Sequence, residues 1–271
     1  MSPWREFMPF ARVNGIKLYY EAYGKGNPLV FLSGFSTHHL TWQSFIEPLQ
    51  DDFQLILLDN RGAGQTTAPA PPYSIAAMAD DTIALMDHLK LDVASMVGSS
   101  MGTAIIQTIA HRAPKRIGKG VLIAPFSKLP RASLLKTMTT GKLLQAGVPL
   151  DLVIETVIPW LFSRDFVASP EKVSAKKAEM TKNPFPQSIE GFLGQMHALE
   201  TFDSSQFIRQ LEAKFLLIAG EEDLSTPFSC AQFLHEHLAN STLHPFSRMG
   251  HMAHAEKHGE VLALIQKFVK M

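Results

Sequence analysis

The chain has 271 residues, 46% of them hydrophobic, and its 25 basic side chains are balanced by 25 acidic ones. This length and apolar content suffice to bury one large core, so we expect a single soluble domain over residues 1–271. The balanced charge argues against nucleic-acid binding, because contacts to phosphates rely on clustered cations.

Hydrophobic segments and cysteine usage bear on the cellular location. No stretch reaches the roughly 18 consecutive apolar residues of a membrane span, and residues 1–10 lack the apolar run of a signal peptide. Cys230 is the only cysteine, so no internal disulfide can form. We therefore expect a cytoplasmic protein with no membrane span.

The N-terminal half reads as alternating strands and helices. A hairpin strand at 16–23 follows an Asn14-Gly15 turn, and strict alternation then continues to residue 124. This pattern implies a mostly parallel sheet with helices on both faces, an α/β fold. The expected strands cover 28–33, 54–59, 93–97 and 119–124, and the expected helices cover 41–50, 74–89 and 101–112.

The alternation is interrupted once. Residues 127–207 read as several helices with no convincing strand, and the sheet pattern resumes afterwards. The resumed pattern comprises a strand at 214–219, a helix at 228–237, a strand at 241–246 and a terminal helix at 256–269. The sequence therefore predicts a core of residues 1–126 and 208–271 with a helical insertion between its two parts.

A Gly-x-Ser-x-Gly pattern marks the candidate nucleophile. Gly98-Ser99-Ser100-Met101-Gly102 lies between a predicted strand and a predicted helix, where a sharp turn lifts the central serine clear of the sheet. The two glycines are needed because side chains there would collide with the neighbouring strand and helix. The pattern selects Ser100, not Ser99, and aims the Met101 N–H at an anion.

A serine nucleophile needs a base and an orienting acid, and both candidates follow in the sequence. Asp223 comes after the strand at 214–219, and His251 opens the last loop before the terminal helix. Two alternatives stay open: Asp223 is a surface carboxylate beside Glu221 and Glu222, or His254 or His258 is the base. Residues 124–127 offer no acid after the preceding strand.

The order serine, aspartate, histidine and the placement of each after a strand resemble the α/β-hydrolase superfamily. The resemblance implies an eight-stranded, mostly parallel sheet with helices on both faces and a helical cap, here about 127–207, inserted after strand 6. It also implies a second oxyanion-hole donor, the Phe35 backbone N–H in Ser33-Gly34-Phe35. Ser33 departs from the family pattern, which usually has His at that position.

The helical cap is expected to decide the substrate. An apolar stretch from 147 to 162 and aromatic residues beyond it could line a pocket or pack on the core. The candidate pocket residues are Trp160, Phe162, Phe185 and Phe192.

Neither a metal nor a cofactor is predicted. Eleven histidines are present, yet no pattern of histidine with cysteine or carboxylate completes a zinc set, and we expect most of them at the surface. Gly62-Ala63-Gly64 lacks the third glycine of a dinucleotide fingerprint and is read as a turn. Asp59 and Arg61 are expected to stabilise that loop.

These parts predict a serine hydrolase that cleaves an ester, lactone or thioester through an acyl-enzyme. A serine nucleophile separates the chain from relatives of this fold that use aspartate. Amide or carbon-carbon bond hydrolysis is a less favoured reading, and a ligand receptor that turns over slowly, if at all, is an alternative from another class.

Within the superfamily, the layout is most similar to small capped carboxylesterases. These include 3-oxoadipate enol-lactonases and the methyl esterases that act on pimeloyl carrier protein. The second comparison implies a possible acyl-carrier-protein partner, docked on a basic run at the start of the cap. A solvated helix face is the alternative reading of that run. Its residues are Lys128, Arg131, Lys136 and Lys142.

Overall fold

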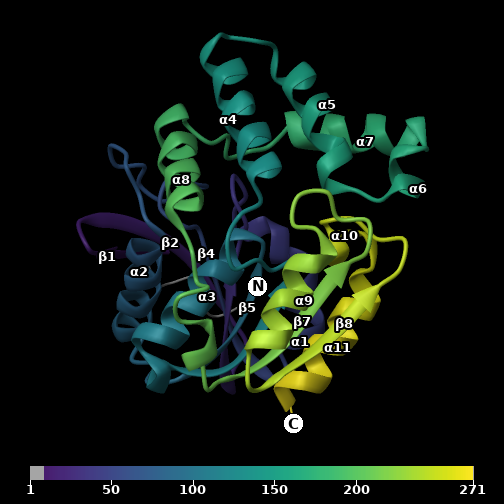
Figure 1. The fold of residues 1–271 in the computed structure, drawn as a ribbon. Coiled ribbons are helices and arrows are strands. Elements are labelled where there is room, and N and C mark those ends of the chain that lie inside the picture. Colours follow the sequence, from purple (N-terminus) through teal and green to yellow (C-terminus); the bar gives the residue numbers. More distant parts are fainter. Residues whose placement is uncertain (1–8, 271) are drawn as a thin grey trace.

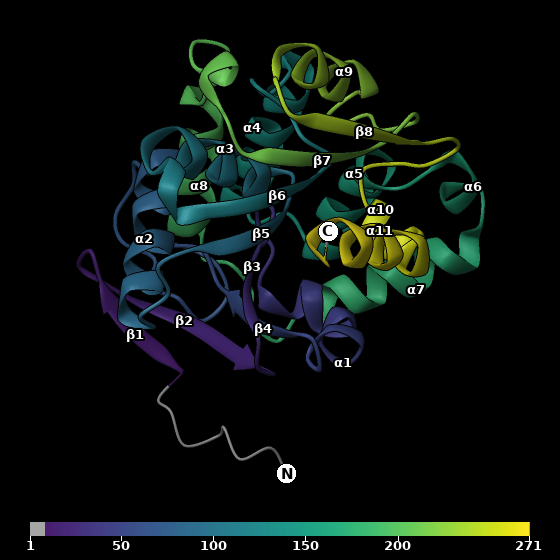
Figure 2. The ribbon, with the colours of Figure 1, turned by 90° about the horizontal axis from the view of Figure 1, so that it is seen from below.

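The computed structural model describes residues 9–270 and contains one eight-stranded sheet (Figure 1, Figure 2). The strands lie in the order β1-β2-β4-β3-β5-β6-β7-β8. Their bounds are β1 Phe10–Val13, β2 Ile16–Tyr23, β3 Asn27–Leu32, β4 Phe53–Leu58, β5 Ala94–Ser99, β6 Ile117–Ile123, β7 Lys214–Gly220 and β8 Ser241–Phe246.

Six of the strands, β3 to β8, pair in parallel, and β1 and β2 pair antiparallel at one edge. The Asn14-Gly15 turn that joins β1 to β2 has positive φ at both residues, as a two-residue hairpin turn requires. The predicted mostly parallel, eight-stranded α/β sheet is confirmed.

Helices cover both faces of the sheet because side chains alternate along the strands. In β3, Val30 and Leu32 belong to one buried cluster, whereas Leu29 and Phe31 belong to the other. The first cluster includes residues of α2 (Ile75–His88), α3 (Met101–Arg112) and α9 (Phe228–His237). The second includes residues of α1 (Ile46–Leu49) and α11 (His258–Lys270), which lie on the opposite side in Figure 2.

The helical segment expected at 41–50 is present but differs in type. Residues His39–Phe45 form a 3₁₀ helix, and a single α-turn, α1, follows. Pro48 within α1 has no N–H to donate to a preceding turn, which disfavours a continuous α-helix here. The terminal helix expected at 256–269 is α11, and a separate short helix, α10 (Ala253–Glu256), precedes it across Lys257, whose φ of −125° is outside the helical range.

Five α-helices lie between β6 and β7 in the sequence, and Figure 1 places them together above the sheet. Part of this inserted segment has a small core of its own, formed by Ile154, Ile158 and Phe162. Among the described residues, no helix is long and apolar enough to cross a membrane. The inserted helices are α4 (Arg131–Gln145), α5 (Leu150–Leu161), α6 (Arg164–Val167), α7 (Pro170–Thr181) and α8 (Ile189–Thr201).

Candidate active site

The turn between β5 and α3 holds Ser100 in a strained backbone conformation. Its φ is +52° and its ψ is −116°, a combination that residues with a side chain rarely adopt. A Cβ atom at Gly98 would lie 2.7 Å from the Gly102 carbonyl carbon, and one at Gly102 would lie 2.2 Å from the Leu32 carbonyl oxygen. Both positions therefore require glycine, as the sequence pattern predicts.

Parallel pairing brings the loop after β3 next to this turn. Leu32 at the end of β3 lies opposite Gly98 of β5. Gly34 follows directly, and a Cβ atom there would lie 3.4 Å from Ser100 Cβ. The loop that carries Phe35 therefore adjoins the candidate nucleophile.

Asp223 and His251 form a buried pair at the same edge of the sheet. Asp223 follows β7, His251 follows the neighbouring strand β8, and His251 Nδ1 lies 2.7 Å from Asp223 Oδ2. Asp223 is only 4% exposed, so it is not the surface carboxylate of the alternative reading. The pair leaves His251 Nε2 as the ring nitrogen that is not bonded to the carboxylate.

Hydrogen bonds fix the Asp223 carboxylate. The Ser225 and Thr226 N–H groups donate to Oδ1 at 2.7 and 2.9 Å, and Thr226 Oγ1 lies 2.9 Å from Oδ2. Thr226 Oγ1 also lies 3.2 Å from His251 Nδ1. The sequence reasoning missed Thr226, although an aspartate followed by serine and threonine two and three residues later is the signal for such a turn.

The competing histidines have no comparable partner. Both ring nitrogens of His254 are buried without a hydrogen bond, and so is Nε2 of His258. Burial, and then the charges of His251, His258 and Lys176, lower the pKa of His254 to about 3. Of the three candidates, His251 is the one bonded to a carboxylate.

The only thiol is a poor alternative nucleophile. Cys230 lies half-buried on α9. Burial, and then the negative charge of Asp223, raise the pKa of this thiol to about 11. It is therefore protonated at neutral pH, and its weak reactivity leaves Ser100 as the candidate.

Hydrogen bonds within the loop, and one from the buried Trp42, stabilise the loop from Ser33 to His38. Ser33 Oγ accepts from Trp42 Nε1 and donates to the His38 carbonyl, both at 3.1 Å, and Thr37 Oγ1 donates to the Gly34 carbonyl at 3.0 Å. Within residues 9–270, neither the Phe35 N–H nor the Met101 N–H donates to another group of the chain. Both stay available for a ligand.

The four predicted pocket aromatics lie in different surroundings. Phe162 is buried in the core of the inserted helices and stacks on Phe166, so for this residue the packing alternative applies. The Phe192 ring packs edge-to-face on the Phe35 ring, with centroids 4.8 Å apart. Phe185 contacts the rings of His38 and His39, and Trp160 faces the ammonium of Lys136.

The basic run does not present four cations on one surface. Lys128 is exposed but pairs with Asp203 at 3.0 Å, while Arg131 and Lys142 are exposed. Lys136 is only partly exposed: its ammonium lies 5.7 Å from the Trp160 ring centroid, and burial lowers its pKa, opposed by the charge of Asp223. The structure gives a carrier-protein partner no support.

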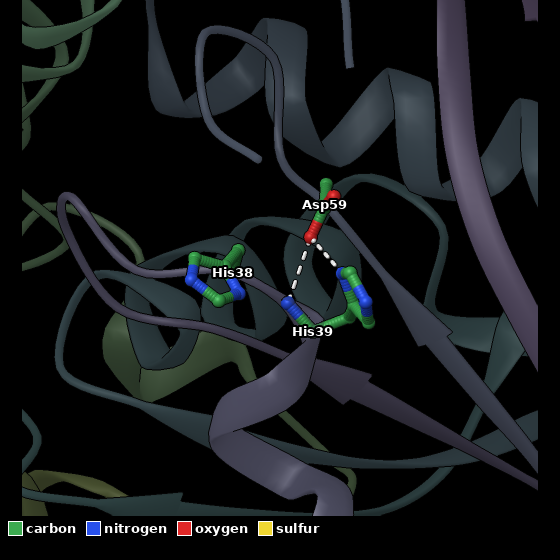
Figure 3. Close-up of side chains that lie close together, drawn as sticks. All are labelled: His38, His39 and Asp59. Carbon is green, nitrogen blue, oxygen red and sulfur yellow. Dashed lines mark hydrogen bonds and ion pairs between the residues drawn. The ribbon is translucent and has the colours of Figure 1, made fainter. Parts of the chain in front are cut away.

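One cluster among the described residues brings potential metal ligands within 4.8 Å of one another, namely His38, His39 and Asp59 (Figure 3). Asp59 and His39 Nδ1 are already engaged in hydrogen bonds, whereas His38 Nδ1 is buried without a partner in the described chain. Asp59 Oδ1 accepts from the His39 backbone N–H at 2.7 Å and lies 2.8 Å from His39 Nδ1, and Asp59 Oδ2 accepts from the Gln65 N–H. Asp59 therefore stabilises its loop, as predicted.

Two other predictions concern Arg61 and the exposure of the histidines. Arg61 forms a two-point ion pair with Asp81 at 2.7 Å, which confirms its structural role. Most histidines lie at least partly at the surface, as expected: within residues 9–270, only His39, His251 and His254 are buried.

A protein-family profile described as "alpha/beta hydrolase fold" matches residues 27–258. Together with the sheet and the serine turn, this match defines the class of protein. The chain belongs to the alpha/beta hydrolase fold family.

Particular relatives agree with this assignment. The chain is 29% identical over 231 residues to 3-oxoadipate enol-lactonase 2 of Acinetobacter baylyi, covering 84% of each chain. It is 27% identical to a protein of Pseudomonas syringae pv. syringae assigned as the carbamate hydrolase RutD, over 82% of this chain and 86% of the relative. The enol-lactonase from Burkholderia xenovorans LB400 shares the fold with a TM-score of 0.86 and 22% identity, over 97% of this chain and all of that one.

Proposed function

We propose that the protein is a serine hydrolase that cleaves a carboxylic ester, lactone or thioester through a covalent acyl-enzyme. The observation that carries the proposal is the buried Asp223–His251 pair, joined by a 2.7 Å hydrogen bond, at the sheet edge where the strained turn holds Ser100. Ser100 is the nucleophile, His251 the general base, and Asp223 the group that orients the imidazole.

The mechanism uses each group in turn. His251 Nε2 takes the Ser100 proton, and the serine oxygen attacks the substrate carbonyl carbon. The negative charge that develops on the carbonyl oxygen is met by the Phe35 and Met101 N–H groups. The alcohol leaves with the proton from His251, and a water molecule, activated by His251, then releases the acid from Ser100.

The range of bonds follows from this chemistry and from the names of the relatives. Lactones and carbamates both present a carbonyl carbon bonded to a heteroatom, which is the group that such a serine attacks. An ester or lactone is therefore favoured over a carbon-carbon bond. A methyl ester such as that of pimeloyl carrier protein falls in the same class, but no contact favours a carrier. A cytoplasmic location stays a prediction from the sequence.

The test compares two neighbouring serines. The protein, Ser100→Ala and Ser99→Ala are incubated with p-nitrophenyl esters of increasing acyl length and with a small lactone, and product release is followed. We expect Ser100→Ala to lose at least about 1,000-fold in kcat. Ser99→Ala, in which the changed side chain makes no hydrogen bond within the described chain, should retain activity within a few-fold.

Two results would count against the proposal. Equal activity in Ser100→Ala would show that another group performs the reaction. No turnover by a folded protein, combined with tight ligand binding, would favour the receptor alternative.

A further inference from the structure

Gln195 links the inserted helices to the loop beside Ser100. It lies on α8 and is fully buried. Its Oε1 accepts from the Ser36 N–H and from Gln187 Nε2, both at 3.0 Å, and its Nε2 donates to the Arg61 carbonyl at 3.0 Å. One side chain of α8 therefore bonds the backbone of two core loops.

The bond to Ser36 restrains the peptide that follows Phe35. Ser36 has a φ of +58°, in the left-handed region that residues other than glycine seldom adopt. On the other side of Phe35, Thr37 Oγ1 holds the Gly34 carbonyl. The Gly34 carbonyl and the Phe35 N–H belong to one planar trans peptide and point in opposite directions, so the two hydrogen bonds together fix where the Phe35 N–H points.

Two more contacts seat α8 against the same loops. One helical turn before Gln195, the Phe192 ring packs on the Phe35 ring. A Cβ atom at Gly191 would lie 2.0 Å from the Gly62 carbonyl oxygen, so the backbone of α8 touches the loop after β4 directly. Because α8 has so little freedom here, a hydrogen bond from Gln195 can hold the loop in one orientation.

We propose that Gln195 is a positioning residue through which α8 sets the orientation of the Phe35 N–H. This inference rests on the proposed function, in which that N–H meets the charge of the transition state. The charge is small in the bound substrate and large in the transition state, so misorientation of the donor lowers kcat and leaves KM nearly unchanged. The inserted segment then contributes to the chemical step as well as to covering the site.

The experiment compares Gln195→Met with Gln187→Met. Methionine keeps the length of the side chain and removes its hydrogen bonds. In Gln187→Met the bonds to Gly62 and to Gln195 Oε1 are lost while the Ser36 bond remains. We expect kcat for a p-nitrophenyl ester to fall about 10- to 100-fold in Gln195→Met with KM within about 3-fold, and both to stay within about 3-fold in Gln187→Met.

Phenylboronic acid forms a tetrahedral adduct with an active serine. Its inhibition constant therefore reports on the donors that bind the tetrahedral state, which a general loosening of the fold would not affect selectively. Its inhibition constant should rise by the same factor as kcat falls. Thr37→Val, which releases the adjacent Gly34–Phe35 peptide from within the loop, should reproduce the pattern even if Gln195→Met folds poorly.

Unchanged kcat and boronate inhibition in folded Gln195→Met would overturn the inference, as would a rise in KM equal to the fall in kcat. Turnover that persists in Ser100→Ala would instead overturn the proposed function, so the two failures are distinguishable.

Discussion

Burial and hydrogen-bond partners give the histidines near the C-terminus different properties, although they lie within a few residues of one another. His251 has a carboxylate partner and a second ring nitrogen for a reaction. His254, three residues later, is buried beside Trp42 with neither nitrogen bonded. The first arrangement suits proton transfer, whereas the second imposes a cost on stability.

The buried His254 should make stability depend on pH. Its pKa is lowered from 6.5 to about 3, so the folded state excludes a proton that the unfolded chain binds below pH 6.5. The contribution of neutral His254 to the free energy of unfolding is fully present above pH 6.5. It is lost as the pH falls towards 3, by up to about 1.4 kcal/mol per pH unit. Between pH 7.5 and 5, this residue should remove about 2 kcal/mol from the free energy of unfolding.

Urea denaturation at the two pH values checks this expectation. Between pH 7.5 and 5, the free energy of unfolding should fall by about 2 kcal/mol less in His254→Leu than in the unchanged protein. His235→Leu, a change at an exposed histidine, serves as the control and should keep the original pH dependence. An identical pH dependence in His254→Leu would show that His254 is not responsible.

Single residues were predictable from sequence where the signal is local or follows chain order. Ser100 stands in a five-residue pattern, Asp223 follows an apolar strand, and His251 follows a short strand. Gln195 offered no such signal, because its partner Ser36 lies 159 residues away in the sequence. Contacts of this kind depend on how the inserted helices pack, which a periodic pattern does not specify.

The strand-turn-helix unit β5-α3 depends on close backbone approach between elements. A Cβ atom at Gly102 would meet the Leu32 carbonyl oxygen of β3 at 2.2 Å, so α3 and β3 would have to separate. We expect Gly102→Ala to lower the free energy of unfolding by about 3 kcal/mol or more, measured by urea denaturation.

Gly259 on α11 is the matched control, because a Cβ built there meets no atom of the described chain within 4 Å beyond its chain neighbours and the backbone of its own helix. Gly259→Ala should leave stability unchanged or raise it by up to about 1 kcal/mol, owing to the higher helix propensity of alanine. Equal stability in the two variants would contradict the close packing of α3 on β3.

Most strands and helices were predicted closely at the scale of elements, and the expected helices at 101–112 and 228–237 coincide with α3 and α9. The apolar runs of β3, β4 and β7 are bounded by turn residues, and the predicted limits differ from the observed ones by at most one residue at each end. The helix type at 41–50 was not predictable, because an apolar pattern interrupted by Pro48 suits a 3₁₀ helix followed by a single α-turn as well as an α-helix.

The sheet order assembles the candidate site at the scale of the whole molecule. β3, β5, β7 and β8 run in parallel, so the residues that follow them meet at one edge although they are spread from 33 to 251 in the sequence. The five inserted helices lie above the sheet in Figure 1. Their existence was predictable from the interrupted alternation.

The directions in which the side chains of the inserted helices point were not predictable. Lys136 turns towards Trp160, whereas Lys142 on the same helix is exposed, and the sequence grouped both in one basic run. Helical periodicity gives the angle between the two positions on α4. It does not give the side of the helix that meets the core.

The central claim is that Ser100 is activated by the Asp223–His251 pair, and covalent trapping tests it most directly. The protein is treated with diethyl p-nitrophenyl phosphate, which phosphorylates activated serines, and is then digested and analysed by mass spectrometry. We predict one diethylphosphoryl group per chain, located on Ser100, absent from Ser100→Ala and formed at least about 100-fold more slowly in His251→Ala. An unmodified Ser100, or labelling at the same rate in His251→Ala, would contradict the account.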